Sequence, residues 1–245
     1  MATAEGPSQL DASPTVTANF GYASFTKPGN NEMKRIQLMA GACALCLIAL
    51  ASIANADVKL PVVFGDNMVL QRGEAVPVWG WDDAGTEVTV TLGKSKVSAK
   101  ADKSGKWMVK LPAMKAGGPH KMTVTGSSTV NVKNILVGEV WLCSGQSNMA
   151  FTVGRSTNAK AEIAAAKYPS IRHISISRRP SDKEEIDVPS GGWQVCSPQT
   201  VGSFTGVGYF FARQLQQELD VPIGLIGSSW GGTRIEPWTA PEGFK

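Results

Sequence analysis

Ser147 lies in a polar turn that directly follows an apolar stretch, in the sequence VWLCSGQSNMAF of residues 140–151. A serine at the end of a buried strand could attack a carbonyl carbon, because reactive groups in open α/β sheets gather at the carboxyl ends of the strands. Gly145 permits the tight bend that such a turn needs. Backbone N–H groups in the turn could hold a developing oxyanion. Serine in a strand-ending turn is also common without catalysis, so position alone leaves both interpretations open.

A serine nucleophile needs a base within hydrogen-bond reach, and the chain contains only two histidines. His120 falls in a region of short predicted strands. His173 lies in the middle of the predicted strand SIRHISIS (170–177), and a mid-strand position rarely reaches a strand-end site. We therefore expect His173 to be a packed or rim histidine rather than the base.

The first region that must support this turn runs from residue 57 to residue 134. Short segments with β-branched or alternating apolar residues are separated there by turn formers such as DDAG and KAGG. A turn about every 8–12 residues is typical of a small antiparallel β-sandwich. The predicted strands are 75–81, 86–93, 97–103, 106–112 and 120–126.

From residue 135 to residue 245 the pattern changes to alternating strands and helices. The run ILVGEVWLC (135–143) is almost continuously apolar, as expected of a strand covered on both faces. Later elements are a helix over 158–169, a strand over 170–177, a helix over 204–220 and a strand over 221–230. This order predicts a parallel α/β sheet with right-handed crossovers. So few strands indicate the first half of a domain.

The N-terminal segment has the pattern of a targeting sequence. Residues 33–56 combine two basic residues, an apolar run and a final Ala-Asn-Ala, which is the layout of a secretory signal peptide cleaved before Asp57. A transmembrane anchor is the alternative, but the apolar run falls short of about 20 residues. We expect export to the periplasm or the extracellular space, without stable membrane insertion after cleavage. Residues 1–32 are polar and are either disordered or an over-extended gene start.

Composition argues against several other classes of function. The net charge is +4, and the basic residues form no concentrated stripe of the kind that nucleic-acid binding requires. No His/Cys cluster has the spacing of a zinc site, so neither a metal nor an organic cofactor is expected. Cys143 and Cys196 would remain in the exported protein. We expect them to be two free, buried thiols, and a disulfide between them is the alternative.

Four segments, in order along the chain, resemble one known family. The segment GEVWLCSGQSNM (138–149) resembles the first conserved block of the sialate O-acetylesterase family, within the GDSL/SGNH hydrolase superfamily. Three further segments are similar to other parts of that family: LPVVFGDNMVLQR (60–72), FTGVGYFFARQL (204–215) and VPIGLIGSSWGGTRIEPW (221–238). The resemblance implies an N-terminal β-sandwich followed by the first half of a flavodoxin-like α/β/α hydrolase domain.

The resemblance also implies roles for individual residues. Ser147 would be the nucleophile, and its backbone amide would form part of the oxyanion hole. In this superfamily a glycine from a second conserved block supplies another hydrogen-bond donor to the oxyanion hole. Gly208 is the candidate for this role, and Gly206 is the weaker one. Alternatively, these glycines only provide flexibility at the start of the helix. Gln146 and Asn148 would contact substrate or fix the turn through side-chain hydrogen bonds; the alternative for Asn148 is that it simply tolerates a left-handed conformation.

The segment that follows the third strand is expected to line a sugar pocket. Trp230, Gly232 and Arg234 are the candidates, because aromatic faces suit a sugar and an arginine can hold a carboxylate with two hydrogen bonds. Trp238 could belong to this pocket or could pack on the sheet.

The implied activity is hydrolysis of O-acetyl esters of sialic acid or related acetylated sugars through a serine acyl-enzyme. The sequence lacks the Asp-x-x-His element by which the family places its base and carboxylate. That element is expected beyond Lys245, so the chain alone should have little activity. The alternatives are an acetylxylan esterase with the same chemistry and a non-catalytic carbohydrate-binding module.

Overall fold

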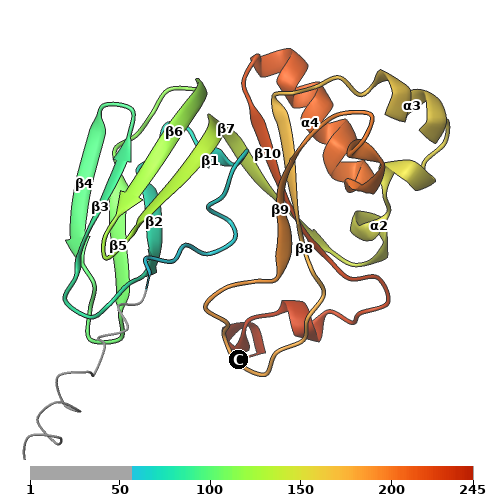
Figure 1. Ribbon diagram of the computed structural model, residues 1–245. Coiled ribbons are helices and arrows are strands. Elements are labelled where there is room, and N and C mark those ends of the chain that lie inside the picture. The colour runs from blue at the N-terminus through green and yellow to red at the C-terminus, as the bar shows by residue number, and fades with distance from the viewer. Residues whose placement is uncertain (1–56, 245) are drawn as a thin grey trace, which may run out of the picture. The chain divides into compact units, whose positions relative to one another are not determined.

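The computed structural model describes residues 57–244 (Figure 1). The predicted signal peptide and the segment before it, residues 1–56, lie outside the described residues. No helix within residues 57–244 is long and apolar enough to cross a membrane.

The first part of the described chain forms antiparallel strands at all five positions that the alternating pattern predicted. A two-stranded sheet pairs β2 (Val76–Trp81) with β5 (Lys106–Leu111). A second set pairs β3 (Glu87–Leu92) with β4 (Ser95–Lys100) and with β6 (Gly117–Thr125). Strand β6 then pairs with the first part of β7 (Thr129–Gly145).

Alternation explains the core between these strands. In β5 the side chains of Trp107, Val109 and Leu111 are buried while those between them are exposed, because successive side chains of a strand point to opposite faces. Trp107 packs directly on Gly80, where an added Cβ would lie 2.8 Å from the indole ring. Only glycine at position 80 leaves room for this ring.

Strand β7 joins the two regions that the sequence pattern distinguished. It is 17 residues long, and the predicted boundary between residues 134 and 135 lies inside it. Its first part pairs with β6, and its last part, Glu139–Gly145, pairs in parallel with β10 (Ile223–Ser229). Between them, β1 (Val69–Gln71) pairs in parallel with residues 136–138. Residue Asn134 has φ 57°, and the pairing with β6 shifts register nearby.

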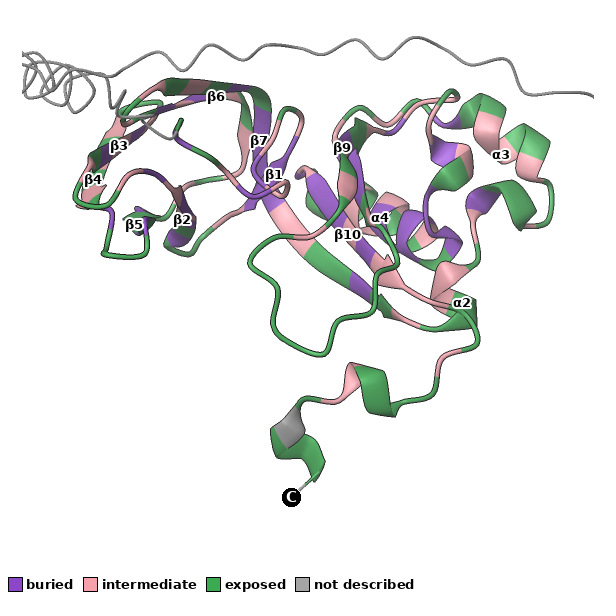
Figure 2. Ribbon diagram, turned by 60° about the horizontal axis from the view of Figure 1, so that its bottom comes forward, coloured by how far each residue is buried: buried purple, intermediate pink, exposed green. Residues whose placement is uncertain are grey.

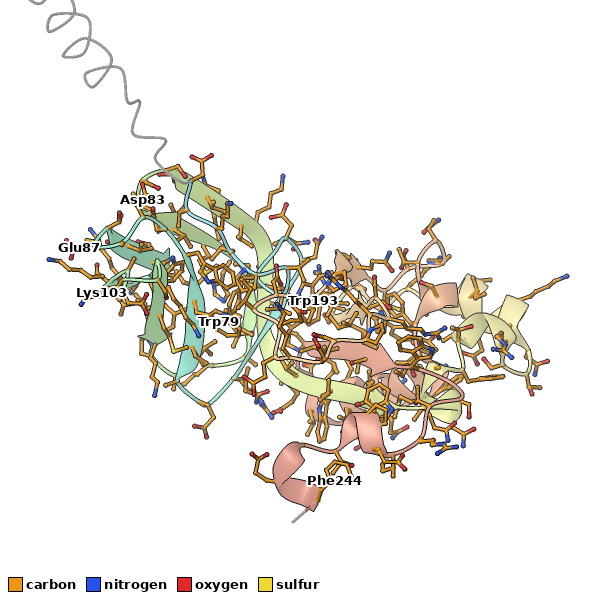
Figure 3. The ribbon with its side chains drawn as sticks, turned by 90° about the horizontal axis from the view of Figure 1, so that it is seen from below. Trp79, Asp83, Glu87, Lys103, Trp193 and Phe244 are labelled. Carbon is orange, nitrogen blue, oxygen red and sulfur yellow. The ribbon has the colours of Figure 1, made fainter. Side chains whose placement is uncertain are left out.

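The second part of the chain contains a mixed sheet: its three predicted strands pair in parallel, as expected, and an additional strand that was not predicted runs antiparallel at the edge. Strand β10 lies between β7 and β8 (Ile171–Ile176) and is parallel to both, whereas β9 (Ser190–Val195) runs antiparallel to β8. Strand β9 has the sequence SGGWQV, which lacks alternation and gave no strand signal. Its buried Trp193 donates from Nε1 to the Val63 carbonyl oxygen at 2.9 Å, where side chains of both regions meet (Figure 3).

Helices pack beside this mixed sheet (Figure 1). Within residues 57–244 the longest helix is α4 (Gly206–Leu219), which packs on β10 and buries Tyr209 and Ala212. The ion pair of Arg213 with Glu162, at 2.7 Å, ties it to α3 (Ala159–Ala165). The other helical segments in the described part of the chain are α2 (Ser147–Ala150), η1 (Val153–Arg155), η2 (Val201–Ser203), η3 (Glu236–Trp238) and η4 (Pro241–Phe244).

Candidate active site

Ser147 lies at the carboxyl end of β7, where the sequence placed it. Gly145 ends the strand with φ +134°, a conformation that favours glycine, and Ser147 is the first residue of the one-turn helix α2. The serine is exposed. Its hydroxyl donates to Gln146 Oε1 at 2.9 Å, and its backbone N–H donates to the same oxygen at 3.1 Å. Gln146 therefore fixes the turn, one of the two roles expected for it, and Asn148 is exposed one residue further on.

The loop after β10 is held against this turn. The Trp230 amide donates to the Gly145 carbonyl oxygen at 2.9 Å. A Cβ at Gly231 would lie 3.4 Å from Ser147 Cα, so the backbone after Trp230 passes directly beside the serine. Gly232 follows in an exposed position with φ +83°. The structure thus brings two of the predicted segments together around Ser147.

Gly208 is buried in the first turn of α4, away from solvent. Its amide donates to Oγ1 of Thr205 at 3.4 Å, which caps the helix. A Cβ at this position would lie 2.8 Å from Cys143 Sγ and 2.6 Å from a methyl carbon of Thr205. The amide of Gly206, the weaker candidate, donates to the Phe151 carbonyl oxygen at 2.7 Å. Both amides are engaged in the fold, and the oxyanion role of Gly208 stays a prediction.

Replacing Gly208 with alanine should lower the free energy of unfolding by about 1–3 kcal/mol, the usual cost of overpacking. The methyl group would press on Cys143, which β7 holds in place. Adding Cys143→Ala should recover part of the loss because it removes the sulfur. Urea unfolding of both single variants and the double variant measures this coupling. A neutral or stabilising Gly208→Ala would contradict the packing.

Two cavities lie at the carboxyl ends of the strands. The first, about 290 Å³, is the α2 cavity; it is lined by Met149, Thr205, His173, Gly227 and Ser229 among others. The second, about 580 Å³, is the tryptophan cavity; it is lined by Trp230, Trp238, Arg178, Arg179 and Thr233 among others. Ser229 and Arg178 line both. Ser147 itself lines neither cavity, but Met149 of α2 lines the first, and Trp230, which is hydrogen-bonded to Gly145, lines the second.

The tryptophan cavity differs in part from the predicted sugar pocket. Trp230 lines this cavity, and its contact with a sugar stays a prediction, but within residues 57–244 Arg234 lines neither cavity, and Arg234 is exposed. Arg178 supplies the guanidinium instead, with Nε 3.4 Å from the Ser229 carbonyl oxygen. Trp238 donates from Nε1 to Thr233 Oγ1 at 2.8 Å, which fixes the far wall. Arg178 lies two residues after the end of β8, so the strand-end rule applied to Ser147 could also have found it.

His173 is packed, as the sequence indicated. It is 3% exposed, and its ring stacks on Phe204 at 4.6 Å between centroids. Its buried Nε2 has no hydrogen-bond partner among residues 57–244 and lies against Gly227, where a Cβ would be 2.7 Å away. Burial lowers the pKa of His173 to about 4, because desolvation penalises the charged imidazolium. The imidazole is thus neutral near pH 7. The other histidine, His120, belongs to β6.

Cys143 and Cys196 are both free and buried. Burial raises the pKa of each thiol, that of Cys196 to about 11, so both stay protonated and unreactive near neutral pH. The favoured prediction of a free buried pair is confirmed. In the part of the chain that the structure describes, no three His, Cys, Asp or Glu side chains gather in a way that could hold a metal ion.

Comparisons with known proteins agree on one family. The model of the family described as "Carbohydrate esterase, sialic acid-specific acetylesterase" matches residues 137–244. The sialate O-acetylesterase of Rattus norvegicus is 38% identical over 198 residues, which cover 73% of this chain and 36% of that protein. The human sialate O-acetylesterase is 38% identical over 202 residues, which cover 74% of this chain and 38% of that protein.

A solved structure extends the likeness to the fold. The crystal structure of a carbohydrate acetylesterase from Xanthomonas citri superposes with a TM-score of 0.74 at 36% identity, over 76% of this chain and 43% of that one. The chain spans less than half the length of these relatives. The family match contains the Ser147 turn, the two cavities and the loop after β10. The chain belongs to the sialate O-acetylesterase family of carbohydrate esterases.

Proposed function

We propose that this chain carries the nucleophile of an esterase that removes O-acetyl groups from sialic acid or related acetylated sugars. The observation that carries the proposal is the exposed Ser147 hydroxyl at the carboxyl end of β7, beside the loop after β10, in a chain of this family. Strand ends of α/β sheets are where reactive groups meet substrate.

In the proposed reaction, Ser147 Oγ attacks the acetyl carbonyl carbon and gives up its proton to a base. The tetrahedral oxyanion collapses, the sugar hydroxyl leaves with a proton, and the acetyl group stays on Oγ until water removes it as acetate. The Ser147 amide would donate to the oxyanion. Since this amide and the hydroxyl both bind Gln146 Oε1, the Gln146 side chain must move aside when substrate enters.

The catalytic base is proposed to lie in the portion of the related esterases that is not aligned with this chain. His173 is unsuited to the role, because its ring is 3% exposed, stacked on Phe204 and lowered in pKa to about 4. A serine without a base remains a poor nucleophile.

The substrate is proposed to lie along the tryptophan cavity. Trp230 and Trp238 offer aromatic surface, and Arg178 offers a guanidinium that can bind a sugar carboxylate. This combination favours an acidic sugar over a neutral polysaccharide. Asn148, Gly232 and Arg234 are exposed and line neither cavity; their predicted contacts with substrate remain part of this proposal.

The test is acetate release by a chimera that joins residues 57–245 to the portion of the Xanthomonas citri esterase that follows its match. O-acetylated sialic acid and acetylxylan are supplied in parallel, and we expect release mainly from the first. Release mainly from acetylxylan would favour the plant-polysaccharide alternative. Sugar binding by a folded chimera that releases no acetate from either would favour a non-catalytic carbohydrate-binding module.

A further inference from the structure

The wall of the α2 cavity contains a buried nitrogen atom without a partner. Nε2 of His173 forms no hydrogen bond within residues 57–244, although leaving a buried polar atom unpaired is unfavourable. The imidazole is held in place by Phe204, on which it stacks at 4.6 Å between centroids. Nε2 lies against Gly227, and both His173 and Gly227 line the cavity. The cavity is therefore the space from which a partner can reach this nitrogen.

A glycine in strand β10 keeps this approach open. Gly227 lies opposite Ser175 where β10 pairs with β8, and a Cβ at Gly227 would lie 2.7 Å from Nε2, so any other residue there would cover the nitrogen. Ser175 and His173 are on the same face of β8, because side chains alternate along a strand. Strand β10 is buried over Ile223–Leu225 and becomes partly exposed toward Ser229, at the end that lines the cavity (Figure 2).

Hydroxyl groups make up most of the remaining polar lining. The serine and threonine residues that line the cavity are Thr152, Ser175, Ser177, Ser203, Thr205 and Ser229. Within residues 57–244 the hydroxyls of Ser175, Ser177 and Ser229 form no hydrogen bond. Among the described residues no Asp or Glu lines the cavity, and Arg178 is the charged residue that does. A cation therefore finds no counter-charge there, whereas a hydroxylated group finds several partners.

The state of His173 favours an uncharged ligand at the inner end of the cavity. Burial lowers the pKa of His173 to about 4, so near pH 7 the imidazole offers no positive charge to an anion. A hydroxyl group both donates and accepts, so it can pair with Nε2 in either tautomer of the neutral ring, whereas a carboxylate only accepts and an ammonium only donates. The cavity volume of about 290 Å³ far exceeds the roughly 30 Å³ of one water molecule. A short hydroxylated chain fits both the lining and the size.

We propose that the α2 cavity binds a short chain of neighbouring hydroxyl groups, which hydrogen-bond to His173 Nε2 and to the hydroxyls of Ser175 and Ser229. Arg178 and Ser229 line this cavity and the tryptophan cavity, so one ligand can occupy both. When the carboxylate of an acidic sugar binds Arg178, the hydroxylated side chain of the same sugar lies in the α2 cavity. This last assignment rests on the proposed function, whereas the subsite itself does not.

The direct test follows the imidazole nitrogens of this chain by NMR at pH 7 while glycerol is added. Glycerol should shift the Nε2 signal of His173 in a saturable way and leave the signals of His120, on β6, unchanged. Sodium acetate should not produce this shift. Ser175→Ala should raise the Kd of glycerol by about three- to tenfold, which is the loss of one hydrogen bond.

Ser144→Ala is the matched control. Ser144 is an exposed serine that lines neither cavity, and its replacement should change the Kd of glycerol by less than about twofold. The subsite is overturned if glycerol leaves the His173 signal unchanged, because the cavity then holds water only. It is also overturned if acetate shifts the signal equally, or if both serine variants weaken binding alike.

Sialic acid connects the subsite with the proposed function. Calorimetry compares sialic acid with a derivative whose hydroxylated side chain has been shortened by periodate oxidation and reduction. The derivative should bind about tenfold more weakly, and Ser175→Ala should weaken binding of the intact sugar only. Equal Kd values for the two sugars would overturn the placement of the side chain in this cavity.

Failure of the proposed function gives different results. Neither sugar carries an acetyl ester, so a chimera that releases no acetate would contradict the esterase proposal and leave these Kd values unaffected. If neither sugar binds, the substrate of the proposed function is wrong, and the glycerol result alone decides the subsite.

Discussion

Replacing Ser147 with alanine should reduce acetate release by the chimera with the Xanthomonas citri segment by at least about a thousandfold in kcat. The loss is this large because the hydroxyl is the proposed acceptor of the acetyl group, and what remains comes from binding and oxyanion stabilisation alone. The KM should change little. Folding should be unaffected, since Ser147 is exposed and its hydroxyl hydrogen-bonds to the neighbouring Gln146 Oε1 within the same turn.

Ser144→Ala is the control for this experiment. Ser144 is another exposed serine, three residues earlier at the end of β7, and its loss should leave kcat within about twofold because surface changes away from a site are nearly neutral. In the 245-residue chain alone, p-nitrophenyl acetate should be hydrolysed equally by the wild type and by Ser147→Ala. Strong turnover that depends on Ser147 in that chain would mean that a base lies within it, and the proposed source of the base would be wrong.

The periodic parts of the fold were predictable from sequence. Strand β5 alternates buried and exposed residues around Trp107. Helix α4 forms where an apolar period predicted a helix, but the predicted inner stripe was wrong in part: Val207, Phe211 and Leu219 are exposed, and the helix buries Tyr209 and Ala212 instead. These patterns are local, because they follow from the directions in which successive side chains point. The placement of Ser147 was predictable for a related reason, since a strand-ending glycine and a polar turn are both visible in the sequence.

Features that depend on distant contacts were not predictable. Strand β9 has no alternation, and it is held in place through Trp193, whose partner Val63 is 130 residues away in the chain. The packing of Gly208 is decided by Cys143 on another element. The exposure of Leu142 is decided by the order of strands in the sheet, which an apolar run cannot reveal. Sequence patterns identify an element well, but they do not show which neighbours it has.

Lowering the pH from 7 to 4 should cost the folded chain about 3 kcal/mol through His173 alone. The pKa of this imidazole is lowered from 6.5 to about 4 by burial. Between these two values the unfolded chain binds a proton that the folded chain does not, so stability is present above pH 6.5 and is lost as the pH falls toward 4. Each unit of difference corresponds to about 1.4 kcal/mol, which makes this single side chain a major determinant of acid stability.

His173→Gln isolates this contribution. Glutamine cannot take up the proton, so the variant should lose about 3 kcal/mol less than the wild type between pH 7 and pH 4, as measured by urea unfolding. Carboxylates with lowered pKa, such as Glu139 beside Arg72, also lose stability in acid, but they do so equally in both proteins and cancel in the difference. If glutamine does not pack beside Phe204, His173→Phe provides the same comparison. Parallel pH profiles for wild type and variants, or an NMR titration of His173 near 6.5, would mean that water reaches the imidazole through the α2 cavity and that the packing inferred against Gly227 is too tight.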